Sequence, residues 1–230
     1  TGLINRIQNG AFALNPNGTE SVSDGGVAFI DYRILTQGAA VEASRLSVPE
    51  AGQSYAGRIT QTNATAQRYG IEQIIEFANC ADLREALMAM SARIRLSIAG
   101  NVRFAILAWA GTANAVTADV VNDWTSESYI PGSFFISTVS VLSQGIFSTT
   151  AATWGSLPYI PIQGNATLNN IVVFMWTEDA CAQNTTLDVG VWQLNAGDEQ
   201  LSFEHRPLAL EEALTTPYTT VVYPEQFGAA

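Results

Sequence analysis

Lysine is absent from this sequence, and charged residues of any kind are scarce. All ten basic residues are arginine, against 21 acidic residues, so the formal net charge is −11. Charged residues make up 13% of the chain, about half the ~25% share of an ordinary globular domain. No basic stripe interrupts this acidic background, and phosphate backbones would be repelled. We therefore expect no nucleic-acid partner.

Histidine and cysteine are almost missing, which limits the metal and nucleophile chemistry open to the chain. His205 is the single histidine, and Cys80 and Cys181 are the two cysteines. These residues cannot supply the four ligands of a zinc site, and the G-x-S-x-G elbow, the P-loop and G-x-G-x-x-G are absent. We expect no catalytic residue and no cofactor. We also expect two buried free thiols, with a disulfide between the two cysteines as the alternative. A weak calcium site at Asp119 and Asp123 is an alternative, because calcium takes carboxylate oxygens.

Long hydrophobic runs are lacking as well. No apolar stretch reaches the ~18 residues that a membrane-spanning helix needs, so we expect no membrane insertion. The sequence begins at Thr1 without a methionine or a signal-peptide pattern. This start fits a processed product or a piece of a longer protein.

Short apolar or alternating segments, broken by Gly and Asn clusters, fill the 230 residues. Hydrophobic residues make up 47% of the chain, which is enough to bury a core. This pattern predicts an all-β fold, a sandwich or a barrel. The candidate strands are Val27–Leu35, Val41–Val48, Gly57–Thr62, Tyr69–Phe77, Val102–Trp109, Phe134–Leu142, Thr153–Ile160, Asn169–Thr177 and Thr186–Leu194.

The stretch "ADLREALMAMSARIRL" carries two periodicities. Leu83, Leu87, Met90 and Ile94 recur at helical spacing, but strict alternation from Met90 continues further along the chain. We predict one helical turn near Asp82–Ala86, followed by a strand from Met88 to Ile98.

The predicted Met88–Ile98 strand places Arg93 and Arg95 on its polar face. In "GIEQIIEF", Glu72 and Glu76 share one face of another strand. If the two strands pair, opposite charges meet across the ladder, each pair worth about 0.2–1 kcal/mol. As glycosidase carboxylates the two glutamates would stand about 13 Å apart, too far for that chemistry. The structural interpretation is therefore favoured.

Aromatic residues in polar stretches are the candidate binding residues. Trp124 and Tyr129 lie in "NDWTSESYIPG", and Trp154 and Tyr159 flank "GSLP". Alternation along its strand places Trp192 on the same face as Asp188. An exposed ring can stack on the apolar face of a sugar, or it can pack against a neighbouring subunit. Other aromatics in apolar strands are expected in the core, namely Trp109, Phe174 and Trp176.

The end of the chain, "TTLDVGVWQLNAGDEQLSFEHRPLALEEAL", resembles the terminal signature of a group of phage and prophage tail-fibre or spike domains. The opening "IQNGAF", the strand "IDYRILTQGAAVEASR", with Ile34 where a Trp is usual, and "FAILAWAGTANAVTADVVNDWTS" resemble other parts of the same group. The matching residues in the terminal signature are Asp188, Gly190, Gln193, Leu194, Gly197, Phe203, Glu204, Arg206, Pro207 and Glu212.

This resemblance implies an antiparallel jelly-roll β-sandwich of the carbohydrate-binding-module type, with at most short helical turns. It implies a homotrimer on a virion, extracellular when functional, in contact with other fibre, baseplate or capsid proteins. We place the sandwich at residues 1–214 and an extended tail at 215–230. The segment "FEHRPLALEEAL" would close the domain beside "NGAF", with Phe203 as a buried anchor and Arg206 held by a carboxylate or backbone carbonyls, and His205 would be incidental.

The hypothesis that follows is a non-enzymatic virion fibre or spike component that binds a host-surface polysaccharide. We expect the glycan site at Trp124, Tyr129 and Trp154, with Asp123 accepting hydrogen bonds from sugar hydroxyls. The alternative is a purely structural fibre or capsid-decoration protein, and a glycan-degrading enzyme is a third, weaker hypothesis.

Overall fold

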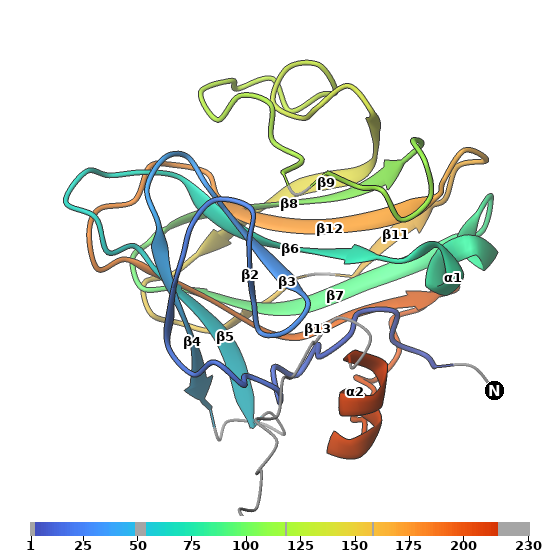
Figure 1. Ribbon diagram of the computed structural model, residues 1–230, viewed down its shortest axis with the longest axis horizontal. Coiled ribbons are helices and arrows are strands. Elements are labelled where there is room, and N and C mark those ends of the chain that lie inside the picture. Colours follow the sequence, from blue (N-terminus) through green and yellow to red (C-terminus); the bar gives the residue numbers. More distant parts are fainter. Residues whose placement is uncertain (1–2, 49–53, 118, 158, 216–230) are drawn as a thin grey trace, which may run out of the picture.

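Most strands of this protein have one buried and one outward side, and they form two facing antiparallel sheets (Figure 1). The computed structural model describes residues 3–48, 54–117, 119–157 and 159–215. Sheet A has the order β1 (Glu20–Val22), β4 (Val41–Ser47), β5 (Tyr55–Thr60), β13 (Thr186–Ala196), β7 (Leu87–Leu96) and β10 (Gly155–Ser156), and β11 (Ile160–Gln163) also pairs with β7. Sheet B has the order β2 (Gly26–Ala28), β3 (Tyr32–Thr36), β6 (Tyr69–Ile75), β12 (Asn170–Thr177), β8 (Gly100–Trp109) and β9 (Val139–Thr149).

Helical structure in the described chain is short. It consists of α1 (Phe77–Cys80), the 3-10 turn η1 (Ala81–Leu83) and α2 (Leu208–Thr215). None of these helices has the length and apolarity that crossing a bilayer requires. The predicted all-β jelly-roll sandwich with short helical turns is therefore confirmed.

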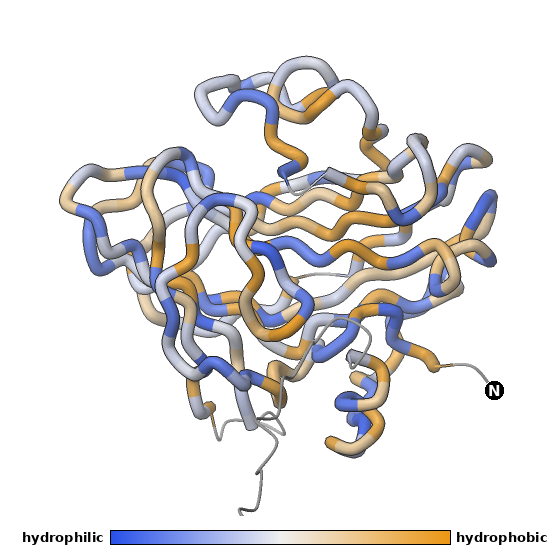
Figure 2. Tube along the Cα trace, viewed as in Figure 1, coloured by the Kyte–Doolittle hydropathy of each residue, from blue (hydrophilic) through white to orange (hydrophobic). Residues whose placement is uncertain are grey.

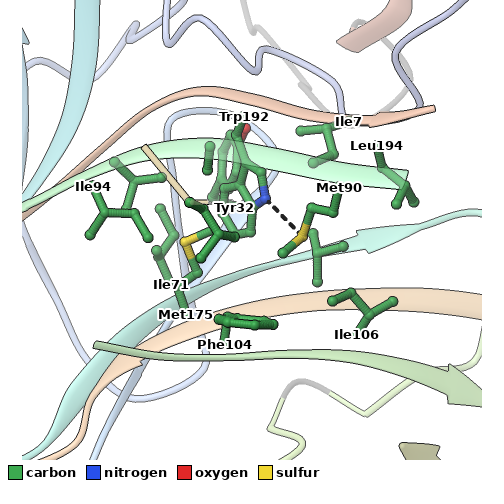
Figure 3. Packing of buried hydrophobic residues seen from close by; sticks show 14 of the residues in the cluster. Ile7, Tyr32, Ile71, Met90, Ile94, Phe104, Ile106, Met175, Trp192 and Leu194 are labelled. Carbon is green, nitrogen blue, oxygen red and sulfur yellow. Dashed lines mark hydrogen bonds between the residues drawn. The ribbon is translucent and has the colours of Figure 1, made fainter. Parts of the chain in front are cut away.

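The core between the two sheets is built from the inward residues of both. Trp192 stacks on Tyr32 at 5.8 Å between ring centroids, and its Nε1–H donates to Met90 Sδ at 3.5 Å (Figure 3). Both cysteines are buried free thiols, as the sequence predicts.

A second apolar cluster covers the outer face of sheet B. Segment 110–138, of which residue 118 is not described, passes over β8 and β12 (Figure 1), and both strands are largely hydrophobic (Figure 2). Phe174 and Trp176 lie beneath it, stacked at 4.6 Å. β12 is therefore buried on both faces, which explains its continuous apolar sequence.

Three of the expected strands are corrected by the structure. The run Val27–Leu35 is the two strands β2 and β3, because Phe29 and Ile30 adopt φ of 51° and 79° and turn the chain. The run Phe134–Leu142 becomes a strand only at Val139, since Phe134 and Phe135 belong to the covering segment. Thr153–Ile160 contributes only the short β10 and the start of β11.

The pairing of Glu72 and Glu76 with Arg93 and Arg95, considered for the case that their strands are neighbours, does not occur. Strand β6 lies in sheet B and β7 in sheet A, so the two charge sets are on opposite outer faces. Alternation predicted the face of each residue within its strand, but it contains no information about which strands share a sheet. The helical turn also comes earlier than predicted, at residues 77–83, and strand β7 follows it as expected.

A β-bulge reverses the alternation within β13. The register with β7 shifts between Gly190 and Gln193, and Val191 has φ of 49°. The extra residue turns the following side chains to the other face. Trp192 is consequently in the core with no exposed surface, not beside Asp188 as the alternation predicts.

The segment after β13 closes the sandwich against the N-terminal segment. The Glu204 carboxylate accepts hydrogen bonds from the backbone N–H groups of Ile4 (3.2 Å) and Asn5 (2.9 Å). The Glu211 carboxylate, on α2, accepts one from the N–H of Asn9 at 2.9 Å. The closing segment thus lies beside "NGAF", and its last part is the helix α2, which the sequence pattern did not predict.

Arg206 is the centre of this closure. Its guanidinium pairs with Glu204 (3.0 Å) and Glu211 (3.4 Å) and donates to the carbonyl oxygens of Asn5 and Ile7. The arginine side chain is 2% exposed. Phe203, expected as a buried anchor, is only half-buried, and its ring meets the exposed His205 edge-on at 5.0 Å. The predicted tail 215–230 lies outside the described residues after Thr215.

Candidate functional site

Trp124 lies at the inner side of the covering segment, not on a polar surface. Its indole packs edge-on against Phe134 (5.7 Å) and Phe174 (6.2 Å), and the residue is 8% exposed. The Trp124 carbonyl accepts a 2.7 Å hydrogen bond from Arg68 Nη1, which ties the segment to the start of β6. The expectation of an exposed indole at this position is therefore wrong, because the segment folds back on its own sheet.

Tyr129, in the same segment, is half-buried. One side of its ring packs on Phe134 and Trp176. The Arg103 guanidinium lies 3.8 Å from the ring centroid, and Arg103 is also paired with Glu178. This end of sheet B thus combines the partly accessible phenol of Tyr129 with Arg103, whose charge is already paired with Glu178.

Asp119 and Asp123 have structural roles in the covering segment. Each accepts a hydrogen bond from the backbone N–H two residues ahead, of Val121 (2.7 Å) and Thr125 (2.8 Å) respectively. Thr125 Oγ1 also donates to Asp123, and this bond lowers the pKa of the exposed Asp123 carboxyl. The described residues contain no group of three acidic, histidine or cysteine side chains suited to a metal ion.

Trp154 lies on the other side of the molecule, over the outer face of sheet A. It precedes β10, whose Gly155 is opposite Ile94 of β7. The guanidinium carbons of Arg95 and Arg93 lie 4.7 and 5.5 Å from its ring centroid. Trp154 is partly exposed while its Nε1 atom is buried without a hydrogen-bond partner. The indole is thus held on a rigid sheet by two cations, which favour the face of an aromatic ring.

An ion triad supports this surface and was not foreseen from the sequence. Asp188 of β13 is fully buried and accepts from Arg58 (2.7 and 3.0 Å) and Arg95 (2.7 Å). The three residues are in register across β5, β13 and β7. Alternation within each strand indicates that these three side chains point outward. The triad could not be predicted, because that also requires the order of the strands in the sheet.

The expected site residues therefore form two separate surfaces. Trp124, Tyr129 and Asp123 belong to the segment that covers sheet B, and Trp154 belongs to the outer face of sheet A. The hydrophobic core lies between these faces, so no single ligand of ordinary size contacts both. The Trp154 surface is defined here as Trp154, Arg93 and Arg95, supported by Asp188 and Arg58.

Comparison with known proteins found no matching family model and no matching curated protein. The similar solved structures include a CBM61 module in complex with β-1,4-galactotriose, with 10% identity, 84% of this chain and 99% of that chain covered, and a TM-score of 0.47. The CBM22-1 xylan-binding domain of Paenibacillus barcinonensis Xyn10C has 10% identity, 87% and 100% coverage, and a TM-score of 0.48. Tailspike protein 4 of bacteriophage CBA120 has 8% identity, 84% and 22% coverage, and a TM-score of 0.45. Such likeness concerns the path of the chain and assigns no function.

Proposed function

We propose that this chain is a non-enzymatic glycan-binding β-sandwich, carried on a virion fibre or spike and directed at a host-surface polysaccharide. The observation that carries the proposal is the Trp154 surface. Its partly exposed indole rests on Arg93 and Arg95 of a central strand. The virion setting is supported by the resemblance of the terminal signature and of "IQNGAF" to tail-fibre domains.

A fixed aromatic ring is suited to sugar binding because little conformational freedom is lost when the ligand arrives. The apolar face of a pyranose leaves water when it stacks on the indole, and neighbouring polar groups orient its hydroxyls. The buried Nε1 atom means that the solvent-facing part of the Trp154 ring is apolar. Among the four expected glycan residues, Trp154 is therefore the primary contact.

Tyr129 is the second candidate contact, with Trp124 and Asp123 shaping the segment that presents it. Its ring is partly accessible, and Arg103 lies against one side of it. Because Tyr129 and Trp154 are on opposite outer faces, single substitutions can separate their contributions. This separation gives the experiment a matched pair of variants.

The experiment is a glycan array probed with the purified chain and with Trp154→Ala and Tyr129→Ala. We expect Trp154→Ala to weaken binding by about tenfold or more, and Tyr129→Ala to retain it. Melting temperatures of the three proteins control for folding. Loss of binding in Tyr129→Ala alone would move the site to sheet B. A wild-type chain that binds no glycan would favour the structural alternative, which the exposed apolar residues near both ends of the described chain also support.

A further inference from the structure

The Arg93 side chain makes no hydrogen bond and no ion pair with any residue that the structure describes. Its guanidinium lies over the ring of Trp154. Every other arginine of the chain donates to a carboxylate or to a backbone carbonyl, and these donors are Arg6, Arg33, Arg45, Arg58, Arg68, Arg84, Arg95, Arg103 and Arg206. A guanidinium carries five N–H donors, so Arg93 presents a set of donors without protein acceptors.

The sheet places no acidic side chain directly opposite this residue on either neighbouring strand. Arg93 is opposite Gly190 on β13, which has no side chain, and opposite Ser156 on β10, which is exposed. Its neighbour Arg95 is already committed to Asp188. Half-buried and resting against an indole, Arg93 is held at the surface without being neutralised.

The charges around Trp154 are opposite in sign to the molecule as a whole. Three arginines, Arg58, Arg93 and Arg95, share this face with one buried carboxylate, Asp188, which pairs with Arg58 and Arg95. The complete chain, in contrast, has a net charge of −11. Glu42 is on the same outer face, but its strand β4 lies beyond β5, which carries Arg58. Glu42 is therefore further from Arg93 than Arg58 is. Since exposed charges are screened over about 8 Å at physiological salt, the distant acidic residues do not cancel this local excess.

We infer that the Trp154 surface binds an acidic sugar, one that carries a carboxylate or a sulfate. The sugar ring stacks on the indole of Trp154, and the anionic group takes the free guanidinium of Arg93. An ionised carboxylate or sulfate is an acceptor-only group, and the planar fork of arginine matches its geometry. The inference rests on the proposed glycan-binding function and adds the class of ligand.

The test uses paired probes that differ only in the anionic group. Oligogalacturonate is compared with its carboxyl-reduced form, and dextran sulfate with dextran, by calorimetry or biolayer interferometry. We expect the chain to bind the acidic member of one pair at least about tenfold more tightly than the neutral member. The pair that responds distinguishes a carboxylate from a sulfate.

Arg93→Gln is the decisive variant, because it removes an unpaired charge from the sheet surface. It should lose the preference for the acidic probe while keeping its melting temperature and any binding of the neutral probe. Arg45→Gln is the matched control, with the same change of charge at an exposed arginine on another face, and it should keep the preference.

Three results would overturn the inference. Equal binding of acidic and neutral probes would remove the acidic ligand class and leave the glycan function standing. Equal losses in Arg93→Gln and Arg45→Gln would show general charge attraction without a site at Arg93. Binding of neither member of either pair, together with a blank glycan array, would overturn the proposed function as well.

Discussion

Glu72 shows at the residue scale how burial alone changes acid–base behaviour. Its side chain is fully buried on the outer side of sheet B, and neither carboxylate oxygen has a hydrogen-bond partner. Burial, followed by repulsion from Asp119, raises the pKa of Glu72 well above its usual value. Burial is also the main cause that raises the pKa of Asp119 to about 6 and of Asp31 to about 7.

These shifts predict a protein that loses stability as the pH rises. Each carboxyl holds its proton more tightly in the folded state than in the unfolded state, so the folded state binds more protons above the unfolded pKa of about 4. The free energy of unfolding should therefore fall from about pH 5 to about pH 8, through the folded pKa values of Asp119 and Asp31. Melting temperatures measured across this range check the sign.

Glu72→Gln should raise the melting temperature at pH 8 and flatten its dependence on pH, because a neutral amide of similar shape replaces a carboxyl that resists ionisation. Each kcal/mol corresponds to about 2–4 °C for a chain of this size. Glu127→Gln, at an exposed glutamate of the covering segment, is the control and should leave the profile unchanged. A Glu72 variant that melts lower than wild type at pH 8 would mean that the ionised carboxylate is stabilised in the fold.

Among the elements, the closing segment and α2 link the two ends of the described chain through one arginine. Arg206→Ala should lower the free energy of unfolding by about 3–5 kcal/mol, because Glu204 and the buried Glu211 lose their counter-charge. Chemical denaturation measures the change. His205→Ala, at the exposed neighbour, should change stability by less than about 0.5 kcal/mol. Equal effects of the two substitutions would contradict a closure centred on Arg206.

Much of each element was predictable from the sequence, and the assembly of elements was not. Alternation located β7 and placed Arg93 on its outer face, but it could not show that β7 and β6 belong to different sheets. It also failed in β13, where the bulge at Val191 moves Trp192 into the core. Local periodicity records which side of a strand is polar, whereas strand order depends on contacts between distant residues.

The polar residues around Trp124 led to an incorrect prediction of its exposure for a related reason. In "NDWTSESYIPG" the neighbours of Trp124 are polar and exposed, so the local pattern indicates a surface loop. The ring is nevertheless buried, because an apolar outer face of sheet B lies below the segment. A loop that covers a second apolar face cannot be recognised until that face is known. Trp154 differs because the arginines beneath it keep its surroundings polar.

For the whole molecule, the homotrimer that the resemblance to tail-fibre domains implies bears on how weak binding sites become effective. Exposed apolar residues gather in segments at both ends of the described chain, and they are Leu3, Ile4, Leu201, Leu208 and Leu210. α2 lies outside the sandwich, near the N-terminal segment (Figure 1). We therefore expect this end of the molecule to contact sister chains in a homotrimer.

Light scattering at micromolar concentration should give three times the mass of one chain. Leu208→Asp with Leu210→Asp should dissociate the trimer without loss of the β signal in circular dichroism, since both side chains are exposed in the single chain. Ile146→Asp, at an exposed apolar residue of β9, is the control and should stay trimeric.

The dissociated variant should still bind a soluble oligosaccharide with the affinity of wild type, because the Trp154 surface is intact. It should bind a glycan-coated surface far more weakly, since three linked sites gain avidity of about 10²–10⁴ over one. A wild-type monomer, or a monomeric variant that holds the coated surface as well as wild type, would contradict this account of attachment.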